Sequence, residues 1–600
     1  MRILLINPPS VHRDFSEVAP PLGLYALAAV AKTLGIETRV WDANIEAQHR
    51  GDARFYADAA AIIAEYNPAL IGLTSMVVNS HIALEVMRVA KEASPSLITV
   101  AGGPHFSSCA AEVIKAFPWV DYIVRGEGEA AFALLLENYA DGTLPRVVAA
   151  PVPQDLLDRV RPPFEDVPWG KYFNRNSRRT VDYESSRGCV FQCTFCYSPG
   201  QWGRMPRYVS DDVVISDLRA LEGYGVEHIF FVDDNFVNDV ERADRLCVRL
   251  ARERINVRWL CYATINRLDK RIINRLAAGG CESVFVGIDA VTSDSQRQFR
   301  KRFFRARDEI VGRLRRCVES GITPTCALIV RPDAGDAELD ELLECAADLR
   351  EVGCAVRLNP LIGYQATPFA PNAQSAWYTE ARVRLMLDDS SLLRENRFAQ
   401  AMPYLFPYHC STREPLANEI HLRDVHAAGT VIRHFPKTVT AMRKQNERVW
   451  SRIQKIARSA RACRRANLRE SERKMAIRTF RQELSSSDAK VAAREFATSA
   501  LLKSEDWIPI VLRSNHRDRV AHVRPFAMDE TGVAPDLLVA AFDQTVRTFE
   551  LDANVDRDEL RAIVALFKTK RPSQSPLHIN KQTVSVLRSA DLLRFPRLQT

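Results

Sequence analysis

The sequence R-G-C-V-F-Q-C-T-F-C-Y-S-P-G, residues 187–200, places three cysteines within eight positions. Gly188 permits the tight backbone that would bring Cys189, Cys193 and Cys196 around one point. Soft thiolates select zinc or an iron–sulfur cluster. A structural zinc site would need a fourth cysteine or histidine at comparable spacing, and none follows within 30 residues. The motif therefore favours an iron–sulfur cluster with one open iron position, with zinc and unliganded core thiols as the alternatives.

Short apolar segments and helical patterns alternate on the carboxyl-terminal side of this motif. About six strand–helix units are expected between Asp182 and Phe369. This alternation predicts a partial (β/α)6 barrel of the TIM type, with the cysteine loop after its first strand. The later strands are expected at 228–234, 258–266, 283–290, 323–332 and 355–361, and the helices at 211–222, 239–254, 269–278, 307–319 and 336–351.

Residues 1–150 show the same alternation in shorter units, and their apolar runs end in Gly, Pro, Asn or Ser. This pattern predicts a doubly wound, Rossmann-like parallel sheet that binds ligands at the carboxyl ends of its strands. Residues 151–180 are rich in proline and charge and have little periodicity, so we expect a linker there. The barrel domain would then occupy residues 181–370.

Residues 371–600 are expected to form a mixed, mainly helical domain that recognises substrate or covers the barrel. Within it, residues 437–481 carry 15 Lys or Arg and three Asp or Glu, with apolar positions at helical spacing. The rest of the chain has 67 basic and 71 acidic residues. A solvated helix face and a site for an anionic partner both fit this basic helix. The scarcity of aromatic residues in it argues against nucleic acid as the partner.

The composition is that of an ordinary globular protein, with 46% apolar and 26% charged residues. No segment approaches the roughly 18 consecutive apolar residues that a membrane span requires. The apolar start of the chain ends at Pro8 and lacks a signal-peptide cleavage site, so we expect a cytoplasmic protein without membrane contact. Its 13 cysteines would then be reduced and available to bind metal.

The cysteine loop, with Phe195 before its third cysteine, resembles that of radical S-adenosylmethionine enzymes. Five further blocks resemble successive parts of their barrel: R-Y-V-S-D-D-V-V-I-S-D-L (207–218), F-F-V-D-D-N-F (230–236), T-I-N-R-L (264–268), A-G-G-C-E-S-V-F-V-G-I-D (278–289) and N-P-x-x-G-Y-x-A-T-P (359–368). Five earlier blocks resemble the cobalamin-binding domain of one large branch: N-P-P (7–9), P-P-L-G-L (20–24), G-L-T-S (72–75), G-G-P-H (102–105) and D-Y-I-V-R-G-E-G-E (121–129). Together they imply a cobalamin-dependent (class B) radical S-adenosylmethionine enzyme over about residues 1–370.

This resemblance implies a [4Fe-4S] cluster on Cys189, Cys193 and Cys196, S-adenosylmethionine on the open iron, and cobalamin. In the family an electron from the cluster cleaves S-adenosylmethionine, and the resulting 5'-deoxyadenosyl radical abstracts a substrate hydrogen. Most characterised members with a cobalamin domain then transfer a methyl group from methylcobalamin. We therefore predict a methyltransferase acting on an unactivated carbon of a specialised metabolite or peptide. Its electron donor would be an external flavodoxin or a ferredoxin-like protein.

The resemblance also implies which side chains bind the two organic cofactors. For S-adenosylmethionine they are Phe195, Asp233, Asp234, Asn235, Arg267, Asp289 and Arg331; for cobalamin they are Asn7, Pro8, Pro21, Gly23, Thr74, Ser75, Gly102, Gly103, His105, Gly126, Glu127, Gly128 and Glu129. Each has a plainer alternative: exposed carboxylates beside a helix cap at Asn238 or Asp239, surface ion pairs for the arginines, and tight turns for the glycines. Asp42-Ala43-Asn44 is the nearest match to a cobalt-ligating D-x-H-x-x-G motif and has no histidine.

Two other functions stay open from the sequence. The same cofactors support a cyclase or rearrangement enzyme without methyl transfer, which the mass of the product would distinguish. The non-catalytic alternative is a zinc-stabilised scaffold that presents the basic helix to an anionic partner. No recognisable pattern covers the loops that select a substrate, so the sequence does not predict its identity.

Overall fold

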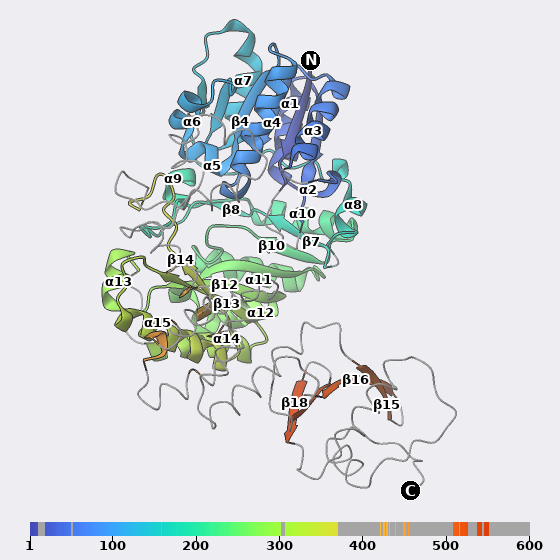
Figure 1. Cartoon of the computed structure of the whole chain (residues 1–600). Coiled ribbons are helices and arrows are strands. Elements are labelled where there is room, and N and C mark those ends of the chain that lie inside the picture. The colour runs from blue at the N-terminus through green and yellow to red at the C-terminus, as the bar shows by residue number, and fades with distance from the viewer. Residues whose placement is uncertain are drawn as a thin grey trace. The chain divides into compact units, whose positions relative to one another are not determined.

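The computed structural model describes residues 1–9, 18–49, 52–157, 159–176, 178–301 and 307–369, isolated positions between 421 and 454, and the backbone of four strands between 508 and 550. The chain divides into two compact units, and the first comprises Met1–Glu338 and Val352–Leu422. This first unit contains both an N-terminal domain and a barrel, coloured blue to cyan and green in Figure 1.

Six parallel strands form the sheet of the N-terminal domain, in the order β2-β1-β3-β4-β5-β6. They are β1 (Arg2–Asn7), β2 (Glu37–Asp42), β3 (Leu70–Thr74), β4 (Ile98–Gly102), β5 (Tyr122–Arg125) and β6 (Val147–Ala149). The strand order reverses between β1 and β3, and doubly wound sheets bind ligands beside such a switch point. The predicted Rossmann-like sheet is confirmed, and only the short β6 was not expected.

Alternating side chains of β1 fill the cores on the two faces of this sheet. Ile3 and Leu5 pack with α1 and α7, whereas Leu4 and Ile6 pack with the helices of the opposite face. The first layer is α1 (Leu22–Thr33) and α7 (Gly128–Asn138); the second contains α3 (Ala53–Tyr66), α4 (Ser80–Ala93), α5 (Gly103–Ser108) and α6 (Ala110–Ala116), and the short α2 (Ala43–Glu46) follows β2.

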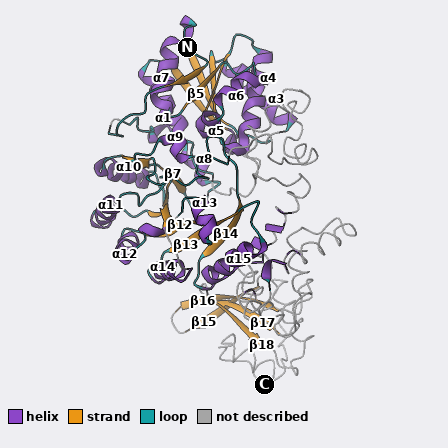
Figure 2. Cartoon of the chain, turned by 90° about the vertical axis from the view of Figure 1, so that its left-hand side faces the viewer, coloured by secondary structure: helices purple, strands orange, loops and turns teal. Residues whose placement is uncertain are grey.

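The second sheet is also parallel, in the order β14-β13-β12-β11-β10-β7, and confirms the predicted partial barrel. Its strands are β7 (Thr180–Tyr183), β10 (His228–Phe231), β11 (Arg258–Thr264), β12 (Cys281–Asp289), β13 (Thr323–Val330) and β14 (Ala355–Pro360). Figure 2 shows its helices in an arc outside the strands. They include α10 (Asp211–Gly223), α11 (Val240–Arg252), α12 (Lys270–Ala278) and α14 (Arg307–Glu319); α13 (Ser293–Gln298) and α15 (Asp336–Glu351) follow β12 and β13 in the chain.

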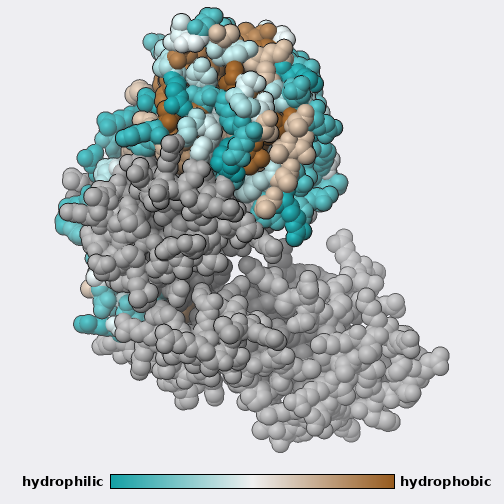
Figure 3. Space-filling view, turned by 45° about the horizontal axis from the view of Figure 1, so that its top comes forward, coloured by the Kyte–Doolittle hydropathy of each residue, from teal (hydrophilic) through white to brown (hydrophobic). Residues whose placement is uncertain are grey.

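The described backbone beyond residue 369 includes a four-stranded antiparallel sheet of β15 (Ile508–Ser514), β16 (Arg517–Pro525), β17 (Leu537–Phe542) and β18 (Thr545–Glu550). The predicted basic helix, 437–481, lies outside the described residues apart from a few isolated positions. Among the helices that can be described, none is both long and apolar enough to cross a membrane. The face of the N-terminal domain in Figure 3 alternates hydrophilic residues with small apolar patches.

The segment predicted as a linker is anchored at both ends. Its helix α8 (Trp169–Phe173) places the Tyr172 hydroxyl 2.9 Å from Asp42 Oδ2, to which it donates a buried hydrogen bond. Burial raises the pKa of Asp42, while this hydrogen bond acts in the opposite direction. Nearer the start of the segment, the guanidinium of Arg161 pairs with Asp217 of α10. The segment therefore fastens the N-terminal sheet to the barrel.

We predict that Tyr172→Phe lowers the free energy of unfolding of the chain by about 1–2 kcal/mol, because the buried Asp42 carboxylate loses a hydrogen bond. Tyr224→Phe is the matched control, since Tyr224 is 41% exposed and stacks on Trp169 through its ring. Urea unfolding followed by tryptophan fluorescence compares the two variants. Equal midpoints would show that the anchor contributes nothing.

Candidate functional site

The cysteine loop connects β8 (Ser186–Arg187) to α9 (Ser198–Trp202), and β8 pairs with β9 (Arg207–Tyr208). Gly188 has a φ of 95°, and a Cβ atom there would lie 2.8 Å from the Met205 carbonyl oxygen. Only glycine fits this position. The Gly188 N–H donates to Asp234 Oδ2 (2.9 Å), and its carbonyl accepts from Asn238 Nδ2 (2.9 Å). The loop after β10 therefore holds the start of the cysteine loop.

The other end of the loop is held by the residues that follow α13. The Thr194 N–H donates to the Phe299 carbonyl (3.3 Å), and the Phe195 ring packs edge-on against Phe299 with a centroid separation of 5.1 Å. Burial raises the pKa of Cys189 to about 11 and that of Cys196 to about 12. The neighbouring thiols and the Asp234 carboxylate contribute to both of these increases. The loop thus holds three closely spaced, half-buried thiols.

This arrangement fits a [4Fe-4S] cluster. Within the described ranges, no three His, Cys, Asp or Glu side chains converge on a single metal ion. A [4Fe-4S] cluster takes one thiolate for each iron, so its ligands surround the cluster instead of meeting at one point. Cys196 lies close enough to both Cys189 and Cys193 for their charges to raise its pKa. Three cysteines would leave the fourth iron free for another ligand.

A buried ion pair lies against the barrel side of the loop. Lys301 Nζ is 2.5 Å from Asp289 Oδ2 and donates to the Gly287 carbonyl (3.0 Å). Burial alone would lower the pKa of Lys301, but Asp289 and the Cys193 thiol outweigh it and raise that pKa. Asp289 has a φ of 62°, a conformation rarely taken by residues other than glycine. Sequence reasoning missed Lys301, because nothing local marks a lysine beyond a short helix.

Asp233 and Asn235 are buried and Asp234 is half-buried, so the alternative of exposed carboxylates is wrong, although Asp239 does cap α11 as that alternative expected. Asp233 accepts hydrogen bonds from the Ser185 N–H (2.7 Å) and from the Ser185 and Ser186 hydroxyls. Asn235 Oδ1 accepts from the Thr264 N–H (3.1 Å). Asp233 and Asn235 therefore join neighbouring strand ends, and Asp234 contacts the cysteine loop.

The two arginines predicted near S-adenosylmethionine lie in different surroundings. Arg331 contacts Gln298 and pairs with Glu338 (2.8 Å) and Asp294 (3.2 Å), as the ion-pair alternative expected. Arg267 is exposed, and its guanidinium carbon lies 6.0 Å from the centroid of the Phe191 ring in the cysteine loop. The structure thus brings Phe195, Asp234, Asp289 and Arg267 to the loop, and engages Arg331 with acidic and amide side chains.

A pocket of about 290 Å³ opens at the carboxyl ends of β1, β3, β4 and β5. Its walls are mainly apolar or glycine, and a Cβ at Gly103 would lie 2.6 Å from Thr74 Oγ1. Glycine backbone lets a bulky planar ligand approach closely, so the pocket fits the corrin ring of cobalamin. The predicted cobalamin residues that line it are Pro21, Gly23, Thr74, Gly102, Gly103, Gly126, Gly128 and Glu129.

The other residues predicted to bind cobalamin are not among those that line the pocket, namely Asn7, Pro8, Ser75, His105 and Glu127. The Asn7 amide donates to Asp42 Oδ1 (2.9 Å), and the Pro8 carbonyl accepts from Asn79 Nδ2 (3.0 Å). The Ser75 hydroxyl donates to the Met76 carbonyl (2.8 Å). His105 is 5% exposed and lies inside α5 beside Cys109. These residues lie beside strand ends, as the sequence indicated, but the sequence did not reveal that they contact protein groups outside the pocket.

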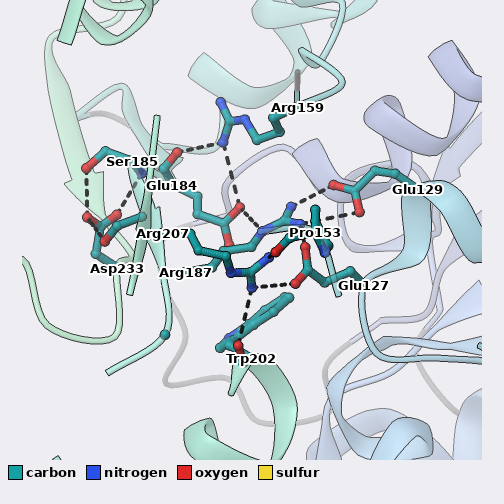
Figure 4. Close-up of polar contacts among 12 residues, drawn as sticks. Glu127, Glu129, Pro153, Arg159, Glu184, Ser185, Arg187, Trp202, Arg207 and Asp233 are labelled. Atoms are coloured by element: carbon teal, nitrogen blue, oxygen red, sulfur yellow. Dashed lines mark hydrogen bonds and ion pairs between the residues drawn. The ribbon is translucent and has the colours of Figure 1, made fainter. Parts of the chain in front are cut away.

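Arg187 connects this pocket to the cysteine loop (Figure 4). It lines the pocket and directly precedes Gly188, and its guanidinium pairs with Glu127 (2.6 Å), Glu129 (2.6 Å) and Glu184 (2.8 Å). Arg207 also pairs with Glu127. The Arg187 side chain is only 10% exposed. Sequence reasoning missed this cation, and its position one residue before Gly188 was the available signal.

Comparison with known proteins agrees with these two sites. Residues 11–136 match the B12 binding domain family, and residues 183–353 match the Radical SAM superfamily. The fold, the pocket and the cysteine loop thus define a cobalamin-dependent radical S-adenosylmethionine protein, whose cofactors are cobalamin, S-adenosylmethionine and a [4Fe-4S] cluster. Within that class, the chain is similar to proteins that are named as a methyltransferase and a methylase.

Relatives with assigned names cover part of the chain. An uncharacterized methyltransferase of Pyrococcus horikoshii is 28% identical over 49% of this chain and 66% of its own length. The hopanoid C-3 methylase of Methylococcus capsulatus is 25% identical over 64% of this chain and 73% of its own. An anaerobic magnesium-protoporphyrin IX monomethyl ester cyclase of Rubrivivax gelatinosus is 25% identical over 48% and 56%. The chain thus matches between about half and three quarters of each relative.

Two solved structures share the fold. The radical S-adenosylmethionine methyltransferase TsrM of Kitasatospora setae superposes with a TM-score of 0.52 and 19% identity, over 61% of this chain and 74% of its own. The cobalamin-dependent S-adenosylmethionine radical enzyme OxsB superposes with a TM-score of 0.56 and 14% identity, over 84% and 79%. At this identity the similarity establishes the architecture alone.

We predict that Gly188→Ala greatly reduces iron binding after anaerobic reconstitution, because the added Cβ would collide with the Met205 carbonyl and distort the cysteine loop. Gly203→Ala is the matched control, since Gly203 also has a positive φ but a Cβ there would meet nothing within 4 Å. Iron analysis of both variants is the measurement. Full iron content in Gly188→Ala would contradict this account of the loop.

We predict that Arg187→Gln lowers the free energy of unfolding at pH 7.5 by about 3–5 kcal/mol, because it leaves buried carboxylates without their cation. Burial raises the pKa of Glu129, but Arg187 outweighs it and lowers that pKa, so this pairing is complete above about pH 4.5 and is lost as the pH falls further.

Without the cation, burial would raise the pKa of Glu129 and would raise further the pKa of Glu184, which burial already holds above its usual value, so the variant would take up protons at a higher pH than the wild type. The stability difference from the wild type should therefore shrink between pH 7.5 and pH 5. Urea unfolding at both pH values measures it. A difference independent of pH would show that the guanidinium acts through packing alone.

Proposed function

We propose that the chain is an enzyme that transfers a methyl group from methylcobalamin to an unactivated carbon of a small-molecule or peptide substrate, by way of a 5'-deoxyadenosyl radical. The observation that carries this proposal is the position of Arg187. It lines the glycine-rich pocket, and Gly188 and Cys189 follow it directly. The pocket that fits cobalamin and the loop that fits the cluster therefore adjoin.

The bound cofactors supply the radical and the methyl group, and the protein supplies positioning and exclusion of water. Asp234 and Asn238 hold the start of the cysteine loop, so the third thiol can face the same cluster as the first. The apolar walls of the pocket, including Leu24 and Phe132, keep water from the corrin. The Lys301 cation beside Cys193 compensates part of the negative charge that three thiolates bring.

Names of the relatives support methyl transfer and also a second candidate. Five of them are named as methyltransferases or methylases, and three others are named as anaerobic magnesium-protoporphyrin IX monomethyl ester cyclases. A cyclase outcome would use the same radical without transferring a methyl group. Mass spectrometry of the product separates the two, because methylation adds one CH2 and ring closure removes two hydrogens.

Purifying the full chain anaerobically, with iron, sulfide and hydroxocobalamin supplied, tests the proposal. We expect about four irons, as a [4Fe-4S] cluster requires, and one cobalamin per chain. Cys193→Ala should lose the iron and keep the cobalamin, whereas Cys247→Ala, which removes a buried thiol in α11, should keep both. Iron without cobalamin would refute methyl transfer from methylcobalamin. Zinc alone would favour the binding scaffold.

A reductant must reach the cluster, and we propose that a flavodoxin or a ferredoxin-like protein of the cytoplasm supplies the electron. The exposed side of the cysteine loop supports an external donor, since Val190 is 41% exposed there and Met205, next to the loop, is 77% exposed. Short distances between such a surface and the cluster favour electron transfer.

A further inference from the structure

The concave face of the barrel carries a layer of aromatic rings beneath the cofactor site. Phe230 and Tyr262 have ring centroids 4.9 Å apart, and Tyr262 and Phe285 are 5.3 Å apart. These three side chains alternate with Ile229, Cys261 and Val284, which are buried on the helix side of the same strands. The aromatic layer therefore crosses three neighbouring strands on the face that the arc of helices does not cover.

Polar side chains at the amino ends of the strands contact one another below this layer. His228 and Glu282 lie at the amino ends of β10 and β12, with Nε2 and Oε2 3.5 Å apart. Arg178 also pairs with Glu282, at 3.2 Å. A molecule resting on the aromatic layer therefore meets its polar contacts above the layer, toward the cysteine loop.

One level above the rings, the strand register aligns four residues. Arg357 of β14 is opposite Ala327, Ala327 is opposite Gly287, and Gly287 is opposite Thr264. Gly287 is the residue whose carbonyl accepts from Lys301 beside the cysteine loop. The two middle residues have almost no side chain, so Arg357 and Thr264 face each other across the level that adjoins the cofactor site.

Arg357 and Thr264 both have unused hydrogen-bonding capacity. Arg357 is exposed, its guanidinium carbon lies 5.8 Å from the Phe285 centroid, and no carboxylate within the described ranges forms an ion pair with it. The Thr264 hydroxyl is buried and has no hydrogen-bond partner in the described part of the chain. Asn359, two residues beyond Arg357 on the same face of β14, is exposed as well. Asp182, the acidic group of this face, lies on the opposite edge strand β7.

From this arrangement we propose that the substrate has a planar apolar body and an oxyanion, a carboxylate or a phosphate. The body rests on the Phe230–Tyr262–Phe285 layer, and the oxyanion pairs with Arg357, assisted by the Asn359 amide. This inference rests on the proposed function, which makes this face of the barrel the substrate site, and it adds the chemical class of the substrate.

Three matched probes test the proposal on the reconstituted full chain: 1-naphthoate, 1-naphthyl phosphate and the neutral 1-naphthamide. By anaerobic titration calorimetry, we expect at least one of the two anions to bind tenfold or more tightly than the amide. The tighter anion identifies the source of the oxyanion. Arg357→Gln should abolish this preference and Arg357→Lys should keep part of it. Arg252→Gln, at the end of α11 outside the barrel, is the control and should change nothing.

A second variant tests the planar body separately. Phe230→Leu should weaken all three probes by a similar factor, because it removes ring area at the far side of Tyr262 from Phe285, the ring that Arg357 contacts. Equal binding of the amide and both anions, or an anion preference that survives Arg357→Gln, would overturn the proposal. Repeating the titration in Cys193→Ala, which lacks the cluster, separates the two proposals. An anion preference there would stand even if the wild type showed no methyl transfer.

Discussion

The ion pairs of Arg187 hold together the two places that must meet for chemistry to occur. Each of the two parallel sheets has a ligand site at the carboxyl ends of its strands. The pocket of the N-terminal sheet and the cysteine loop of the barrel must lie next to each other for the proposed reaction. Glu127 belongs to the turn after β5, Glu129 belongs to the first turn of α7, and Arg187 belongs to the strand that leads into the cysteine loop. A buried cation among three carboxylates is stable only when all partners are present. The contact therefore fixes the distance between corrin pocket and cluster loop in a way that apolar packing would leave adjustable.

Unusual backbone conformations concentrate around these sites. Gly188 and Gly103 have positive φ angles, and both positions would collide with backbone or a side chain if they carried a Cβ. Asp289 takes a left-handed conformation without being glycine, and Lys301 holds it there through an ion pair. Such strain persists only where surrounding contacts determine the geometry. The packing of the barrel thus offsets the strain at Asp289, and the Asp289 carboxylate and the Lys301 ammonium group are held against the barrel side of the cysteine loop.

Periodicity and turn residues predicted most of the fold, because the apolar pattern within each segment determines which face of that strand or helix is buried. The cysteines and the pocket glycines were also visible, because a tight loop or a close approach selects its residue type locally. Sequence reasoning did not identify Arg187, Lys301 and Arg357 as site residues. Each contacts residues that are distant in the chain, and no local pattern distinguishes such an arginine or lysine from one on an ordinary surface. Asn7, Pro8 and His105 do not line the pocket, and their contact with cobalamin stays a prediction. They stand beside the right strand ends, but Asp42, Asn79 and Cys109 are their neighbours, and a sequence block does not say which side of the sheet edge a residue faces.

The concave face of the barrel provides a physical criterion for choosing among candidate substrates. A neutral polycyclic hydrocarbon bound above the aromatic layer would bury the Arg357 guanidinium without a counter-charge, at a cost of several kcal/mol. The same guanidinium gains a strong, orienting hydrogen-bonded pair when the ligand carries an oxyanion. Under the proposed substrate class, the positive charge on β14 therefore opposes a neutral polycyclic substrate. Because the cofactors are common to the family, selectivity for a substrate must come from residues such as Arg357. The contribution of Arg357 to the binding free energy is unfavourable for a neutral ligand and favourable for an anionic one.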